Sequence, residues 1–114
     1  MKKELFKIDT VVKDLIPEYD HALSFYKKAF IRSYYNADGI RIKIELISYY
    51  TIMVTYENGI LTFNKNAYNY SNTTLRHVKE FLRQVNYLLI NYPTLYNADR
   101  ITKKDIFKIA KIEA

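Results

Sequence analysis

The sequence predicts an α+β fold in which a three-stranded antiparallel β-meander packs against two to four helices. Three observations lead to this prediction. Residues 40–46 alternate apolar and polar side chains, Asn58-Gly59 separates two β-branched and aromatic runs, and residues 75–89 carry an apolar stripe at helical spacing. The chain contains no repeat and no Gly- or Ser-rich linker, so we expect residues 1–114 to form a single domain.

The N-terminal part is expected to hold one ambiguous segment and one helix. Residues 5–16 fit a strand or a helix, and the β-branched pair Val11-Val12 favours a strand. Pro17 suits the first turn of a helix, where its missing N–H has no cost. The stripe that predicts this helix consists of Tyr19, Ala22, Leu23, Tyr26, Ala29 and Phe30.

The central part gives the meander. Residues 36–39, Asn-Ala-Asp-Gly, are typical of a turn. The alternation over residues 40–46 predicts a first strand with one solvated face. Residues 50–56 and 60–63 predict the other two strands, and Asn58-Gly59 predicts a type I′ turn between them because both turn positions need a positive φ.

Two further helices are expected in the C-terminal part. The first has Ser71, Asn72 and Thr73 as possible N-caps, and we expect it to end at or just before Pro93. Its apolar stripe consists of Leu75, Val78, Phe81, Leu82, Val85, Leu88 and Leu89. Residues 102–105 resemble a capping box with Asp in place of Glu. A short final helix would then carry Ile106, Ile109 and Ala110.

Composition excludes several classes of function. Without cysteine the chain has no disulfide, thiolate nucleophile or cysteine-ligated zinc, and two glycines are too few for a glycine-rich phosphate loop. No apolar run approaches the roughly 20 residues that cross a bilayer. The first residues lack the apolar stretch of a secretory signal. We therefore expect an intracellular protein that does not bind membranes.

Net charge and aromatic content suggest a binding function. The net charge of +6 divides into +2, +1 and +3 over residues 1–32, 33–99 and 100–114. Such a spread favours a solvated basic surface over a dedicated nucleic-acid face. The 12 tyrosines suit interfaces or base stacking, although the accompanying Ile and Asn indicate the codon bias of an AT-rich genome.

Residues typical of metal or catalytic sites do not gather in the sequence. His77 has Thr73 and Phe81 rather than acids at i−4 and i+4, so we expect no metal site there. Its ring is expected to bond a hydroxyl such as that of Ser48 or Thr74.

The remaining catalytic candidates are also weak. His21 follows Asp20, but neighbouring helical residues point about 100° apart and do not share a metal easily. No serine has the glycine neighbours of a nucleophile elbow. Glu45 and Glu57 are expected to be surface charges. We therefore expect no catalytic residue, cofactor or metal.

A basic and aromatic cluster is the main candidate binding site. Arg41 and Lys43 are expected on one strand face, with Tyr49 and Tyr50 just beyond. Cations interleaved with aromatic rings suit single-stranded nucleic acid, although the solvated side of an ordinary sheet also has this pattern. Further candidates for contact with phosphate or an acidic protein surface are Lys103, Lys104, Lys108 and Lys111.

A predicted strand begins at residues 48–51, Ser-Tyr-Tyr-Thr. It is followed, at residues 70–82, by the sequence Tyr-Ser-Asn-Thr-Thr-Leu-Arg-His-Val-Lys-Glu-Phe-Leu. This stretch resembles a pattern shared by small uncharacterised proteins of phages and mobile elements in low-GC Gram-positive bacteria. In that pattern a hairpin ends in Tyr-Ser-x-Thr-Thr, and a helix follows with His and then Phe-Leu. The resemblance covers about residues 48–85. Its expected structural residues are Ser71, Thr73, Thr74, His77 and Phe81.

The resemblance implies a phage accessory protein in the bacterial cytoplasm, and such proteins often block a host enzyme. Anti-CRISPR proteins are the best-known class, but many are acidic DNA mimics whereas this chain is basic. We therefore expect a non-enzymatic inhibitor that binds a host defence nuclease, such as a CRISPR effector, on an acidic surface, guide RNA or protein interface. The alternatives are a basic nucleic-acid-binding regulatory protein and a small RNA-cleaving toxin. A homodimer formed by pairing of exposed strand edges is a further alternative.

Overall fold

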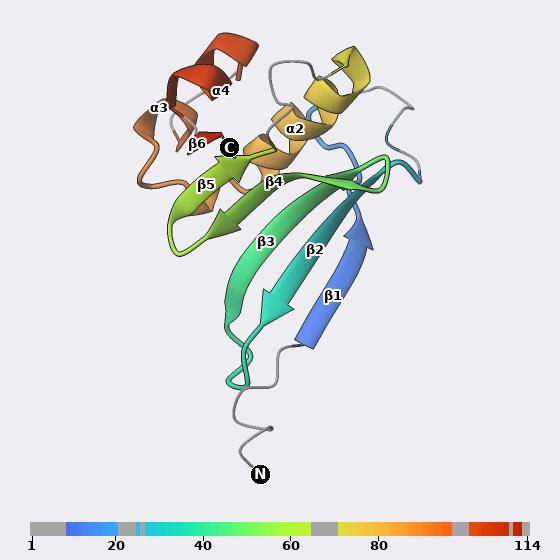
Figure 1. The fold of residues 1–114 in the computed structure, drawn as a ribbon, viewed down its shortest axis with the longest axis vertical. Helices are drawn as coiled ribbons and strands as arrows, with labels where there is room; N and C mark the ends of the chain where they lie inside the picture. The colour runs from blue at the N-terminus through green and yellow to red at the C-terminus, as the bar shows by residue number, and fades with distance from the viewer. Residues whose placement is uncertain are drawn as a thin grey trace.

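The computed structural model describes residues 9–20, 25, 27–64, 71–96, 101–109 and 111–112. In these residues helices pack on one face of a six-stranded sheet, which confirms the α+β class (Figure 1). The strands are β1 (Asp9–Asp14), β2 (Ala29–Tyr35), β3 (Arg41–Ser48), β4 (Thr51–Glu57), β5 (Ile60–Phe63) and β6 (Lys111–Ile112). The helices are α2 (Asn72–Gln84), the 3-10 helix η3 (Asn86–Leu88), α3 (Pro93–Tyr96) and α4 (Lys103–Ile109).

The strands lie in the sheet in chain order. Strands β1 to β5 pair with one another in antiparallel orientation, and β6 pairs in parallel with β5. The predicted meander corresponds to β3, β4 and β5 and is confirmed. The predicted number of three strands was wrong, because β1 and β2 extend this sheet on one side and β6 extends it on the other.

Strand β2 replaces the end of the helix predicted from Tyr19 to Phe30. Lys27 has a φ of 55°, which no α-helix contains, and residues 29–35 pair with β1 and β3. Two neighbouring strands satisfy the backbone groups on both sides of this segment, which outweighs its helical spacing. Residues 21–24 and 26 lie outside the described residues. The strand expected within residues 5–16 is confirmed for residues 9–14.

Local turn chemistry sets the hairpins around β3 and β5. Asn58 and Gly59 have φ angles of 54° and 76°, as the predicted type I′ turn requires. In the turn before β3, Asn36 Oδ1 accepts hydrogen bonds from the backbone N–H groups of Asp38 and Ile40 at 2.9 and 3.0 Å. These contacts fix where β3 begins.

Helix α2 begins as predicted and ends earlier than predicted. Ser71 is its N-cap, and its Oγ accepts the backbone N–H of Thr74 at 3.1 Å. The helix ends at Gln84, and Val85 is the C-cap. Pro93 was expected to end this helix but is instead the first residue of α3, a position where proline is favoured.

Helix α4 begins with the predicted capping box. The backbone N–H of Thr102 donates to Asp105 Oδ2 at 2.9 Å, and the backbone N–H of Asp105 donates to Thr102 Oγ1 at 3.3 Å. The two residues therefore satisfy each other's free backbone donors. Ala110, also expected in this helix, lies outside the described residues.

The hydrophobic core lies between the sheet and the helices. Its fully buried side chains from the sheet are Ala29, Leu46, Val54, Leu61 and Phe63, and those from the helical part are Val78, Phe81, Leu82, Leu89 and Leu95. No helix in the described part is long and apolar enough to span a membrane.

A buried carboxylate joins the segment after β1 to α2. The carboxylate of Glu80 accepts the backbone N–H groups of Glu18, Tyr19 and Asp20 at 3.0, 3.0 and 2.8 Å. Glu80 is only 2% exposed. Three consecutive amides therefore solvate one buried negative charge, which fixes this segment against the helix.

Candidate functional site

The sheet face opposite the helices carries the candidate site, and we call it the open face. Paired residues of neighbouring strands point to the same face of a sheet. One row across the strands is Val12, Arg32, Glu45, Thr55 and Thr62, and the next is Thr10, Tyr34, Lys43, Glu57 and Ile60. The third row is Asp14, Phe30, Ile47 and Ile52.

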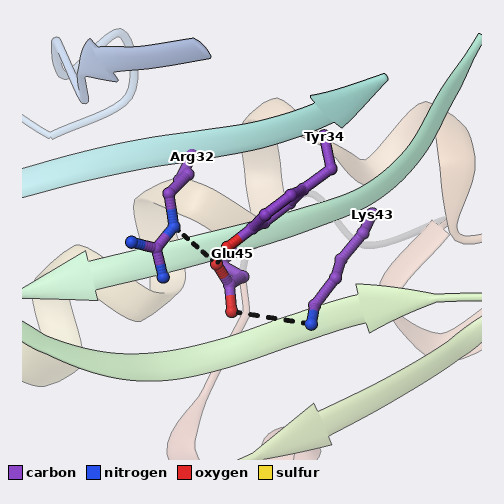
Figure 2. A network of polar contacts seen from close by, with 4 residues as sticks. All are labelled: Arg32, Tyr34, Lys43 and Glu45. Atoms are coloured by element: carbon purple, nitrogen blue, oxygen red, sulfur yellow. Dashed lines mark hydrogen bonds and ion pairs between the residues drawn. The ribbon is translucent and has the colours of Figure 1, made fainter. Parts of the chain in front are cut away.

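A polar cluster lies at the centre of the open face. Glu45 Oε1 accepts hydrogen bonds from Arg32 Nε at 2.7 Å and from the Tyr34 hydroxyl at 2.6 Å (Figure 2). Its Oε2 lies 3.9 Å from Lys43 Nζ. Figure 2 shows these four side chains on the side of the strands away from the helices. We call Arg32, Tyr34, Lys43 and Glu45 the central cluster.

Burial and charge hold the central cluster in one arrangement. The Glu45 side chain is 4% exposed, whereas those of Arg32 and Lys43 are 29% and 30% exposed. The hydrogen bond to Glu45 raises the pKa of Arg32 above its ordinary value. Burial and the bond to Glu45 raise the pKa of Tyr34, so its hydroxyl remains protonated and keeps donating at neutral pH.

The two cations also contact the ring of Tyr34. Lys43 Nζ lies 5.3 Å and Arg32 Cζ 5.6 Å from the centre of the ring. Both distances are within the range of cation–π attraction. The ring is therefore fixed at its hydroxyl by Glu45 and flanked by two positive charges, so this side chain has little conformational freedom left to lose on binding.

Exposed aliphatic side chains surround the central cluster. Val12, Ile52 and Ile60 are 55%, 39% and 50% exposed, and all three belong to the rows of the open face. Apolar groups around a fixed aromatic and cationic centre are typical of protein-binding surfaces.

The turn between β3 and β4 adds a strained tip to one end of this sheet. Ser48 pairs with Thr51, so Tyr49 and Tyr50 form the two-residue loop, with φ angles of 49° and 67°. Left-handed φ angles are unfavourable for bulky residues. Tyr50 is 89% exposed and therefore gains little from packing in return. The loop therefore presents the aromatic side chain of Tyr50 to solvent at the end of the hairpin.

Comparison with protein families identifies the wider group of this chain. Residues 14–107 match the model of a family of unknown function, DUF8033. The chain belongs to this family. No match was found among curated proteins, and none among solved structures.

The structure separates two cations of the predicted binding site. Arg41 and Lys43 were expected on one strand face, but an irregularity between β2 and β3 places Arg41 opposite Tyr35 and Lys43 opposite Tyr34. Since Tyr34 and Tyr35 are neighbours on a strand, these two cations lie on opposite faces. Arg41 Nη2 instead donates to the Tyr87 hydroxyl at 2.7 Å.

The C-terminal lysines lie away from the central cluster. Lys103, Lys104 and Lys108 are exposed on α4, and Lys111 is in β6. These elements lie beyond β5, at the margin of the sheet opposite to β1 (Figure 1). The structure therefore does not combine them with Lys43 in one surface.

Three of the predicted structural residues, Ser71, Thr74 and His77, make hydrogen bonds around the start of α2. Ser48 Oγ lies 2.7 Å from His77 Nδ1, the contact expected from the sequence, and 3.5 Å from Thr74 Oγ1. His77 and Phe81 are fully buried, whereas Thr73 is half-buried. Within the described residues, no group of His, Asp or Glu is placed to hold a metal ion.

Sequence reasoning missed three residues of the central cluster. Arg32 and Tyr34 lie beyond the segment predicted as a helix and were not considered as binding residues, and Glu45 was expected to be a surface charge but is buried. A signal was present in the alternation of Phe30, Arg32 and Tyr34 with smaller side chains, which has the period of a strand.

Proposed function

We propose that this protein acts without catalysis, by binding a partner protein through the open face. Following the resemblance of residues 48–85, we further propose that the partner is a host defence nuclease and that binding inhibits it, a CRISPR effector being the main candidate. The observation that carries the proposal is the central cluster, in which buried Glu45 fixes Arg32, Tyr34 and Lys43 among exposed aliphatic side chains.

The chemistry of the central cluster supports a protein interface. Tyr and Arg are the residues that most often contribute strongly to protein binding. Glu45 uses only the Nε of Arg32, and the terminal nitrogens of this side chain are suited to a partner carboxylate. Because Tyr34 and Arg32 are already held in place, binding loses less side-chain entropy than binding by free surface residues.

The charge of the open face favours protein over nucleic acid as the partner. Its rows include the acids Asp14, Glu45 and Glu57 against the bases Arg32 and Lys43. Affinity for a phosphate backbone comes mainly from phosphates neutralised by Lys and Arg, and acidic residues among these cations reduce it. The open face mixes both signs, which suits a protein surface with its own mixture of charges.

The central cluster also resembles the polar groups of an RNA-cleaving site, and the position of Glu45 argues against that use. A general base must reach the proton that it removes. Glu45 is 4% exposed, and its Oε1 already accepts two hydrogen bonds. The carboxylate therefore acts on its neighbours and not on a substrate.

Inhibition assays with purified components test this proposal. The full chain is titrated against a panel of CRISPR effector–guide complexes while cleavage of a labelled DNA duplex is followed. We expect a stoichiometric loss of cleavage with at least one effector. Absence of inhibition across the panel would contradict the proposed partner, and cleavage of labelled RNA by the protein alone would contradict a non-catalytic role.

Variants of the open face test the surface separately. Arg32→Glu and Val12→Asp should each weaken inhibition by about tenfold or more, as expected for loss of a central interface contact. Val12 is 55% exposed, so its substitution leaves the core intact. Lys104→Glu makes the same charge change as Arg32→Glu on exposed α4 and should have no effect. Full inhibition by both open-face variants would overturn the assignment of this surface.

A further inference from the structure

Strand β1 is the edge strand at one side of the sheet. All six of its residues are exposed, and they include Val11 at 39% and Val12 at 55%. β1 lies at the margin of the sheet (Figure 1), and within the described residues no strand pairs with its outer side. Such an edge presents unpaired N–H and C=O groups to any strand that approaches it.

The hydrogen bonding of Leu15 shows which residues of β1 present these groups. The backbone N–H of Leu15 donates to the Ala29 carbonyl at 2.9 Å, so Leu15 points its backbone groups toward β2. The direction in which the backbone N–H and C=O groups point alternates from one residue of a strand to the next. The backbone groups that point inward, toward β2, therefore also include those of Asp9, Val11 and Lys13. The N–H and C=O groups that point outward are those of Thr10, Val12 and Asp14.

This alternation restricts how two copies of β1 can pair as antiparallel strands. An outward-pointing residue must lie opposite another outward-pointing residue for both hydrogen bonds to form. One register that satisfies this rule is centred on Val11 and pairs Thr10 with Val12 of the second copy. Other registers that satisfy it are centred on Val12, which pairs Thr10 with Asp14 of the second copy, on Lys13, which pairs Val12 with Asp14, and on Thr10, which pairs Thr10 with Thr10.

Charge complementarity selects the register centred on Val11. It places Asp9 of each chain opposite Lys13 of the other, which gives two cross-strand pairs of opposite charge. These are non-hydrogen-bonded positions, where side chains approach most closely. The register centred on Val12 places Lys13 opposite Val11, and the register centred on Thr10 places Asp9 opposite Val11, so neither gives such a pair. The register centred on Lys13 places two like charges opposite each other. Within the described residues, no salt bridge holds Asp9 or Lys13 in the single chain.

We propose that two copies of this chain associate through β1, antiparallel about a two-fold axis at Val11. The sheet then continues from one chain into the other through four backbone hydrogen bonds, two from each pairing of Thr10 with Val12. The two Val11 side chains contact each other at the axis, and the Asp9–Lys13 pairs lie on either side of it.

Sedimentation velocity of the full chain over a range of concentrations tests the association. We expect a species of about 27 kDa, twice the 13.6 kDa of one chain, at the higher concentrations. Asp9→Lys and Lys13→Asp each place like charges opposite one another at two positions, so each variant alone should dimerise about tenfold or more weakly. A wild-type chain that stays monomeric throughout would overturn the proposal.

An equimolar mixture of the two variants tests the register. The Asp9→Lys chain carries lysine at both positions and the Lys13→Asp chain carries aspartate at both. Each cross-strand pair of a mixed dimer therefore joins opposite charges again, and the mixture should recover the dimer. Recovery also shows that both variants are folded.

A charge change outside β1 is the matched control for this experiment. Asp38→Lys makes the same charge change as Asp9→Lys in an exposed turn and should dimerise like wild type. A mixture that remains monomeric, or single variants that dimerise like wild type, would contradict the proposed pairing.

Discussion

Ser48 Oγ and His77 Nδ1 lie 2.7 Å apart between β3 and α2, and neither residue is exposed to solvent. Their contact joins segments that are 29 residues apart in the chain. The His77 ring also lies 4.7 Å from the ring of Phe25 and 5.8 Å from that of Tyr49. This imidazole therefore connects the start of the helix to the end of the β3–β4 hairpin.

Ser48→Ala should destabilise the fold by about 1–3 kcal/mol, because a buried ring nitrogen loses its hydroxyl partner. Urea unfolding with an unchanged m-value would measure the loss. In the double variant with His77→Phe, the added cost of Ser48→Ala should be much smaller, since no polar nitrogen is left unpaired. Additive effects of the two substitutions would show that this bond does not stabilise the fold.

Glu80→Gln should cost about 2 kcal/mol, because hydrogen bonds to a charged acceptor are stronger and the amide nitrogen of Gln cannot accept. The backbone N–H groups of Glu18, Tyr19 and Asp20 would then compete for one oxygen. Faster amide exchange at these three residues would locate the effect. Glu57→Gln, at an exposed position, is the matched control and should leave stability unchanged.

Tyr34 should titrate above its ordinary pKa of 10.0, and its contribution to stability has a defined pH range. Because the native pKa is raised, the stabilisation is complete below pH 10 and is lost as pH rises through the native value. The ultraviolet titration of wild type minus that of Tyr34→Phe should show this late tyrosine. Tyr34→Phe should cost about 1–2 kcal/mol at neutral pH through the lost bond to Glu45. A midpoint at or below pH 10 in this difference titration would contradict the hydrogen bond between Tyr34 and Glu45.

Asp105 should stabilise the start of α4 only above acidic pH. Hydrogen bonds from the backbone and side chain of Thr102 lower its pKa below the ordinary 3.8. Its stabilisation is therefore present above pH 3.8 and is lost as pH falls through the lower native value. Urea unfolding of wild type and Asp105→Asn should differ at neutral pH and converge in acid. A difference that does not depend on pH would show that the charge has no part in the cap.

Tyr50→Gly should raise stability by about 0.5–1 kcal/mol, because glycine adopts a left-handed φ without steric cost. Tyr50 is 89% exposed, so little packing is lost. Thr51→Gly, one residue later in β4, has no positive φ to relieve and should be destabilising. If the tip contacts the partner, the stabilised Tyr50→Gly variant should bind more weakly. A variant less stable than wild type would show that the turn is not strained.

The local features of the fold could be predicted because their causes are close in the chain. Ser71 caps a backbone N–H three residues later, Thr102 and Asp105 cap each other, and Asn58-Gly59 supplies both positive φ angles of its turn. In each case the side chains and backbone groups involved lie within a few residues. Residue type and spacing were therefore enough to place them.

Strand β2 and the central cluster could not be predicted in this way. Residues around Ala29 fit the spacing of a helix and of a strand, and pairing with both β1 and β3 decides between them. Glu45 has the sequence context of a solvated charge, since Lys43 is two residues away. It is buried only because β2 brings Arg32 and Tyr34 beside it.

The sequence by itself determined the α+β class, the β3–β5 meander and the helix caps, because periodicity and capping depend on neighbours in the chain. Only the tertiary structure decided the order of the strands, the face to which each cation points and the burial of Glu45. Those features depend on which strands pair and in which register. A shift of one residue, as between Tyr34 and Tyr35, is enough to separate Arg41 from Lys43.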